Sequence, residues 1–192
     1  GAIMAARRVA AQSGSSIRYM CGDARYLPFA SDSFDVVFSY SVLQHLSIEN
    51  VNVVLKEIAR VLKPGGISLI QMPNRLGVRC LYHQARRGFR EARGFEVRYW
   101  SIDSLQGAFL KAIGDTSIAI DCFFGLGLQK SDRHLMSPLR RAIVNASETL
   151  KAAAGCAPWL RHFADSVFVL SRLRNDGAQT PASTSNERIV VR

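Results

Sequence analysis

The chain has 192 residues, of which 48% are hydrophobic and 21% are charged. This balance is typical of a folded globular domain and excludes disorder along the whole chain. No apolar run approaches the roughly 20 residues that a membrane-spanning helix needs. The 25 basic residues outnumber the 15 acidic ones, which gives a net charge of +10.

The four cysteines, Cys21, Cys80, Cys122 and Cys156, lie far apart in the sequence. Their spacing offers no CxxC pair for a zinc site. So few cysteines in a chain of this length do not indicate a disulfide framework. We therefore expect reduced thiols, no metal site and a cytoplasmic location.

Apolar periodicity predicts an alternation of helices and strands along the chain. The predicted helices are residues 1–12, 47–63, 101–113 and 138–153. The predicted strands are residues 17–21, 34–39, 67–72, 116–124 and 165–173. Ser47, Ser101 and Ser137 stand where N-caps are expected. Strand–helix–strand units with short connections favour a right-handed crossover and a parallel sheet.

Two sequence motifs go beyond the fold class. Residues 21–29 read CGDARYLPF, and residues 32–46 follow with DSFDVVFSYSVLQHL. Residues 57–66 read EIARVLKPGG, at the end of a predicted helix and before a predicted strand. In this order and spacing they resemble the second half of a class I S-adenosylmethionine-dependent methyltransferase of the type 11 kind.

The resemblance covers about residues 1–125, and the last predicted strand also fits. It implies a partial Rossmann-like α/β fold, with a mostly parallel sheet and flanking helices. Residues 1–173 would form this domain, with a helical insert at about 125–164. The polar composition of residues 174–192 predicts a disordered tail.

The resemblance also implies which residues bind the cofactor, S-adenosyl-L-methionine. Asp23 follows a predicted strand, and its carboxylate can accept a hydrogen bond from an exocyclic amine. The backbone N–H of Ala24 can donate to the neighbouring ring nitrogen, so that the pair reads an adenine edge. By the same resemblance, the backbone at Ser39 and Tyr40 lines the sulfonium and methionine end. Without the flanking motifs, Asp23 would more simply cap a turn.

One departure from the family pattern is large. The family opens with a strand, a glycine-rich loop, a helix and a second strand that ends in an acid. This sequence begins inside the helix that should follow, so we expect a chain truncated before the first βαβ unit. We also expect this chain to be unstable and inactive alone, and to bind the cofactor poorly.

The predicted substrate side is the stretch of residues 73–98, which holds seven arginines and two glutamates. Guanidinium groups suit carboxylate and phosphate, and the candidates for an anionic acceptor are Arg86 and Arg87 with Tyr82 and His83. A solvated basic face is the alternative. RNA is a rival partner, but no RNA-binding motif is present. His45 could orient a substrate or act as a base, although a packing role is favoured.

The leading hypothesis is methyl transfer to a small-molecule, lipid-linked or sugar-type acceptor of anionic character. No protein nucleophile is needed for this reaction, and no catalytic residue is assigned. The helix at 138–153 either walls an acceptor pocket or simply packs on the domain. A dinucleotide-dependent oxidoreductase and a non-catalytic fragment that binds anions or RNA are the alternatives.

Overall fold

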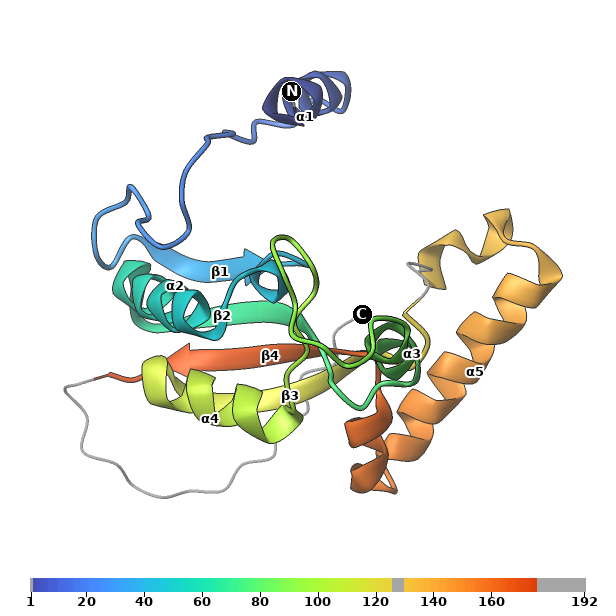
Figure 1. Cartoon of the computed structure of the whole chain (residues 1–192). Coiled ribbons are helices and arrows are strands. Elements are labelled where there is room, and N and C mark those ends of the chain that lie inside the picture. Colours follow the sequence, from blue (N-terminus) through green and yellow to red (C-terminus); the bar gives the residue numbers. More distant parts are fainter. Residues whose placement is uncertain (1, 126–129, 176–192) are drawn as a thin grey trace.

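The computed structural model describes residues 2–125 and 130–175. Its helices are α1 (Ala2–Gln12), α2 (Ile48–Val61), α3 (Val78–Arg86), α4 (Ile102–Ala112) and α5 (Pro138–Ala154). Its strands are β1 (Phe34–Ser39), β2 (Leu62–Pro73), β3 (Gly114–Cys122) and β4 (Ser166–Leu173). The strands form one sheet in the order β1-β2-β4-β3 (Figure 1). The tail predicted at 174–192 lies outside the described residues from 176 onward.

The sheet confirms the predicted α/β class, with a difference in strand direction. β1 and β2 are parallel and are connected through α2, whereas β4 is antiparallel to both β2 and β3. The predicted sheet was mostly parallel, but one of the three observed pairings is parallel. The reason is that the chain between β3 and β4 returns to the sheet at the end where β3 stops, so β4 must run back.

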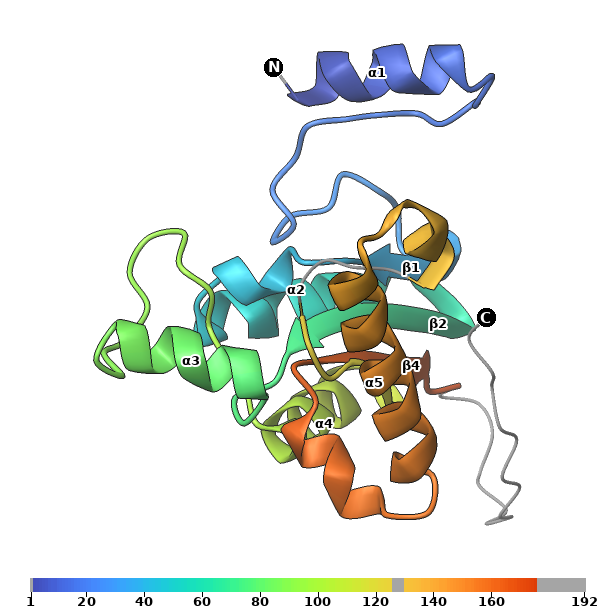
Figure 2. The ribbon, with the colours of Figure 1, turned by 90° about the vertical axis from the view of Figure 1, so that its right-hand side faces the viewer.

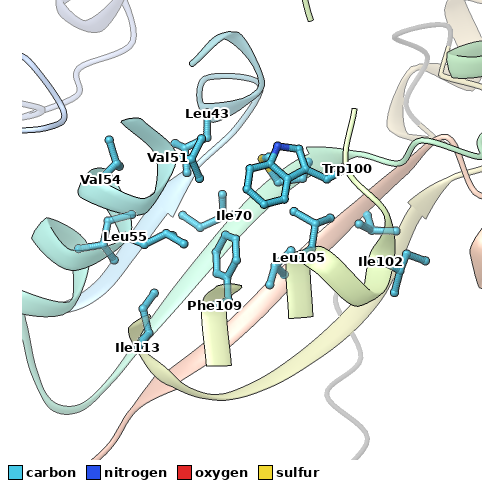
Figure 3. Packing of buried hydrophobic residues seen from close by; sticks show 14 of the residues in the cluster. Leu43, Val51, Val54, Leu55, Ile70, Trp100, Ile102, Leu105, Phe109 and Ile113 are labelled. Carbon is cyan, nitrogen blue, oxygen red and sulfur yellow. The ribbon is translucent and has the colours of Figure 1, made fainter. Parts of the chain in front are cut away.

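One face of the sheet is covered by α2 and α4, and the main core lies there. Leu55 from α2, Ile70 from β2 and Phe109 from α4 are fully buried and pack together (Figure 3). The predicted apolar stripes of both helices are confirmed. Ser47 and Ser101 cap these helices, accepting hydrogen bonds from Asn50 N at 3.3 Å and Ser104 N at 3.1 Å. Ser137 holds the N-cap position of α5 without a side-chain hydrogen bond.

The N-terminal segment differs most from expectation. α1 forms where it was predicted but lies apart from the sheet (Figures 1 and 2), and Met4 and Val9 are 55% and 63% exposed. Residues 17–21 form no strand. Among the described strands β1 pairs with β2 alone, so this segment has no strand beside it to satisfy its backbone groups.

The two motifs contact each other through Glu57 and Arg60 on α2. The Glu57 carboxylate accepts a hydrogen bond from Leu27 N at 2.8 Å. Arg60 donates to Leu27 O at 2.9 Å, to Phe29 O at 2.8 Å and to Glu57 at 2.8 Å. These contacts hold the loop before β1 against α2, which gives both motifs a structural role. They also lower the pKa of Glu57 from 4.5 to about 2, with the Arg60 hydrogen bond as the largest cause.

This shift predicts an acid-sensitive attachment of the loop. Because the folded pKa lies below the ordinary value, the contribution of Glu57 to stability is present above pH 4.5 and is lost as pH falls towards 2. We expect Glu57→Gln to lower the urea midpoint at neutral pH. The decrease in the midpoint between neutral pH and about pH 3 should be smaller for this variant than for the wild type. Glu91→Gln, at an exposed site outside both motifs, is the control. An equal acid sensitivity of the Glu57→Gln chain and the wild type would contradict the assignment.

Candidate functional site

A cavity of about 850 Å³, here called the central cavity, lies at the carboxyl ends of β1 and β2. It is walled by α3 and α5, which lie at the end of the sheet towards which β1 points (Figures 1 and 2). The carboxyl ends of parallel strands are where open α/β sheets bind ligands. The lining residues that carry polar chemistry are Tyr40, Ser41, Gln71, Arg79, His83, Tyr99, Asp121, Ser147, Glu148, Lys151, Asp165 and Ser166.

The buried carboxylate of Asp165 holds the base of this cavity together. Its Oδ1 accepts from Arg79 N at 2.8 Å and from Cys80 N at 3.4 Å, at the beginning of α3. Its Oδ2 accepts from Gly125 N at 2.8 Å, just beyond β3. Gly77 approaches Asp165 so closely that a Cβ at position 77 would collide with it. The charge thus fixes α3 and the segment after β3 to the start of β4.

The helix α5 forms a wall of the central cavity. Val144 and Ser147 are buried on this side, and Ser147 Oγ accepts a hydrogen bond from Phe123 N at 3.1 Å. Leu150 and Ala154 of the same helix pack against the hydrophobic core, whereas Leu139 near its beginning is 72% exposed. α5 therefore both lines the cavity and packs on the domain, as the two interpretations of this insert expected.

A chain of hydrogen bonds, here called the Gln71 relay, crosses the sheet beside the cavity. Ser41 N and Ser41 Oγ donate to Gln71 Oε1 at 2.9 and 3.0 Å. Gln71 Nε2 donates to Ser166 Oγ, which in turn donates to Asp121 Oδ2 at 2.8 Å. Ser41 has a positive φ of 56°, an uncommon conformation that turns the chain at the end of β1. Burial and the nearby Asp121 charge raise the pKa of the Tyr40 phenol.

The predicted cofactor residues fall in two places. Ser39 and Tyr40 lie at the end of β1, and Tyr40 lines the central cavity. Asp23 and Ala24 lie in the loop before β1, outside the residues that line the cavity. Arg25 forms an ion pair with Asp23 at 2.6 Å, and its hydrogen bonds lower the Asp23 pKa to about 2. Asp23 is thus an exposed, ionised hydrogen-bond acceptor. An ionised carboxylate can accept a hydrogen bond from the amine of a ring. Arg25 donates to both oxygens of Asp23, so it has to release one of them when such a ring binds.

The predicted acceptor residues are separated by the structure. His83, Arg86 and Arg87 line a second hollow of about 470 Å³, here called the basic hollow. His83 also lines the central cavity, so the two spaces share a wall. Tyr82 is 58% exposed and lines neither of them, although Arg86 lies over its ring at 5.8 Å.

His45 also lies outside both spaces. Its ring stacks on Phe95 with centroids 4.0 Å apart, and its Nδ1 lies 2.8 Å from Phe95 O. Its Nε2 lies 3.2 Å from Gln44 Nε2. Both ring nitrogens therefore have partners within the protein. This arrangement supports the packing interpretation and not a catalytic base.

Several arginines of the basic stretch are used inside the protein. Arg90 is paired with Glu96 at 2.6 Å, and Arg98 donates to His45 O at 2.8 Å. Arg79 Nη1 donates to Gly125 O at 2.6 Å, and Arg79 Nε donates to His83 Nε2 at 3.3 Å. Part of the basic stretch is therefore a framework that holds the loop after α3 and the segment after β3.

The sequence interpretation missed Asp121, Gln71 and Ser166. Asp121 and Gln71 stand near the ends of predicted strands, which is a usable signal, but nothing local shows that they meet. The cavity also contains Cys80 and Cys122, whose pKa values are raised to about 12 by burial. These cysteines remain protonated thiols, and all four cysteines of the chain are free. No cluster in the described part of the chain could hold a metal ion.

Known proteins match the first part of the chain. Residues 1–70 match the family described as "Methyltransferase domain". A ubiquinone biosynthesis O-methyltransferase of Parvibaculum lavamentivorans is 36% identical over 66 residues, 34% of this chain and 25% of that protein. The C-methyltransferase UbiE of Cereibacter sphaeroides is 40% identical over 73 residues, 35% of this chain and 28% of that protein. The chain thus spans about a quarter of these relatives.

Solved structures match over more of the chain. The YcgJ protein from Bacillus subtilis has a TM-score of 0.55 at 21% identity, covering 91% of this chain and 79% of its own. The [4+2]-cyclase SpnF has a TM-score of 0.53 at 22% identity, covering 90% of this chain and 62% of its own. The fold is therefore that of the class I methyltransferases. Residues 1–70, which hold both motifs, are similar to the methyltransferase family, in agreement with the resemblance that the motifs predicted.

The Asp165 contacts predict a large loss of stability on their removal. We expect Asp165→Ala to lower the free energy of unfolding by about 3 kcal/mol, because one buried and two partly buried N–H groups lose their acceptor. Urea denaturation measures this change. Asp115→Ala, at an exposed position on β3, is the matched control and should change stability little. Similar midpoints for the two variants would contradict the role given to Asp165.

Proposed function

We propose that this domain transfers a methyl group from S-adenosylmethionine to a small molecule bound in the central cavity. The observation that carries the proposal is the position of this cavity. It opens at the carboxyl ends of the two parallel strands, beside the backbone of Ser39 and Tyr40. The match of residues 1–70 to the methyltransferase family supports the choice of cofactor.

Four residues would hold the cofactor. The Asp23 carboxylate would accept a hydrogen bond from the adenine amine, and Ala24 N–H would donate to the neighbouring ring nitrogen. The backbone at Ser39 and Tyr40 would line the methionine end. When bound, the cofactor supplies an already activated methyl group. The protein then has to orient the acceptor and exclude water.

The acceptor that fits the site is elongated and anionic at one end. Arg86, Arg87 and His83 in the basic hollow suit a carboxylate or phosphate, and His83 also lines the central cavity, so an anion in this hollow would lie next to that cavity. The relatives named for ubiquinone and menaquinone biosynthesis also favour a small-molecule acceptor over a macromolecule.

A nucleic-acid partner is disfavoured by the same arginines. Glu96 neutralises the charge of Arg90, and Arg98 uses N–H donors on the carbonyl oxygen of His45, so both offer less to a phosphate backbone.

None of the described helices is long and apolar enough to cross a membrane. We propose the cytoplasm as the place of action, since the cysteines are free.

Titration calorimetry with S-adenosylhomocysteine tests the cofactor site. We expect Asp23→Ala to weaken binding about tenfold or more, because a charge-assisted hydrogen bond is lost. Arg25→Ala is the matched control, since it removes the ion pair but keeps the carboxylate, and should bind as tightly as the wild type or more tightly. Equal affinity of Asp23→Ala and wild type would contradict the adenine contact. Because we expect this chain to bind the cofactor weakly, the titration uses a high ligand concentration. A wild-type chain that binds neither S-adenosylhomocysteine nor S-adenosylmethionine under these conditions would contradict the proposed function.

A further inference from the structure

The carboxylate of Asp121 lies in the central cavity, and the proposed function gives it no role. It lies near the end of β3 and lines the central cavity, together with Tyr40 and Ser41 from the end of β1. Asp121 and Tyr40 line the same cavity from the ends of two different strands of the sheet. None of the sequence motifs includes Asp121, and its side chain is only partly buried.

The Gln71 relay determines the direction of every hydrogen bond that leads to Asp121. Gln71 Oε1 accepts two hydrogen bonds from Ser41, so the amide NH₂ must face Ser166. The single proton of the Ser166 hydroxyl is then given to Asp121 Oδ2. Gln71 and Ser166 are 5% and 7% exposed, so this arrangement is shielded from water. Asp121 is thus held as a hydrogen-bond acceptor, with Ser166 as its sole side-chain donor in the described part of the chain.

Several side chains that line the central cavity together with this carboxylate are aromatic. Tyr40 and Phe168 pack with ring centroids 6.2 Å apart, and Phe38, Tyr99 and Phe124 also line the cavity. Such walls suit a planar ring. A ring that carries a hydroxyl group can donate its O–H hydrogen to Asp121, whereas an anionic oxygen would be repelled by the carboxylate.

We propose that Asp121 is the catalytic group that takes the proton from a phenolic hydroxyl group of the methyl acceptor. This proposal rests on the proposed methyl transfer. Gln71 and Ser166 are positioning residues, because they act on the reaction through Asp121. The acceptor oxygen gives its proton to the Asp121 carboxylate and forms a bond to the methyl carbon. The bond between that carbon and sulfur breaks with its electron pair left on sulfur, so that a neutral thioether, a methyl ether and a carboxylic acid result.

The experiment uses 4-nitrophenol as a probe, with the full chain and without a methyl donor. The ionised form of this phenol absorbs visible light, so its absorbance reports the protonation state of the bound probe. The titration is run at a pH equal to the pKa of the free probe. We expect the phenolate band to fall when the wild type is added, with about a tenfold rise in the phenol-to-phenolate ratio of the bound probe.

Asp121→Asn should abolish this fall, because a neutral amide no longer favours the protonated phenol. Asp115→Asn, at an exposed position on the same strand and outside the cavity lining, is the matched control and should behave as the wild type. Ser166→Ala should give a smaller fall than the wild type, since the carboxylate remains but loses its support. Thermal melting of each variant checks the fold, and Ser166→Ala carries the test if Asp121→Asn does not fold.

Three outcomes would overturn the proposal: no binding of the probe, a phenolate band that is unchanged or rises with the wild type, or the same fall with Asp121→Asn. Failure of the proposed function is a separate result. It is measured by titration with S-adenosylhomocysteine, whose proposed contacts are the loop before β1 and the backbone at the end of β1, and not the Asp121 carboxylate.

Discussion

Three backbone N–H groups from two separate segments of the chain donate to the carboxylate of Asp165. Asp165 is 2% exposed, and a buried charge of this kind is tolerated only where hydrogen bonds replace its water. Two of the donors begin α3, where the helix dipole also favours a negative charge. The third lies beyond β3. The wall and the base of the central cavity therefore depend on one side chain, which also requires glycine at position 77.

Most residues that line the cavity do not belong to the motifs that resemble the methyltransferase family. Glu57 and Arg60, from the second motif, hold the backbone of the first motif at Leu27 and Phe29. They explain why the two motifs occur together, yet they do not line the cavity. The chemistry instead lies at strand ends, where a side chain can change without disturbing the sheet. This separation explains why the sequence identifies the fold more readily than the acceptor.

Local patterns were sufficient for much of the fold. The strand at 34–39 and the buried faces of α2 and α4 follow from apolar periodicity, because those residues pack against the sheet along their whole length. The strand expected at 17–21 did not form, since a strand depends on a partner that its own sequence does not encode. The Gln71 relay could not be predicted from the sequence, because its residues lie far apart along the chain. Gln71 and Ser166 are 95 positions apart, and Asp121 and Ser166 are 45 apart.

The position of the charges around the cavity says more than the net charge of the chain. Much of the basic stretch is used within the protein, as Arg90 with Glu96 and Arg98 with His45 show. Arg86 and Arg87 remain beside the basic hollow, while Asp121 lies on the sheet side of the central cavity. The central cavity itself carries both signs of charge, since Arg79 and Lys151 line it as well as Asp121. The orientation of an acceptor would therefore depend on two separate contacts: its anion with the arginines of the basic hollow, and its hydroxyl group with Asp121. Reversing the molecule would lose both contacts.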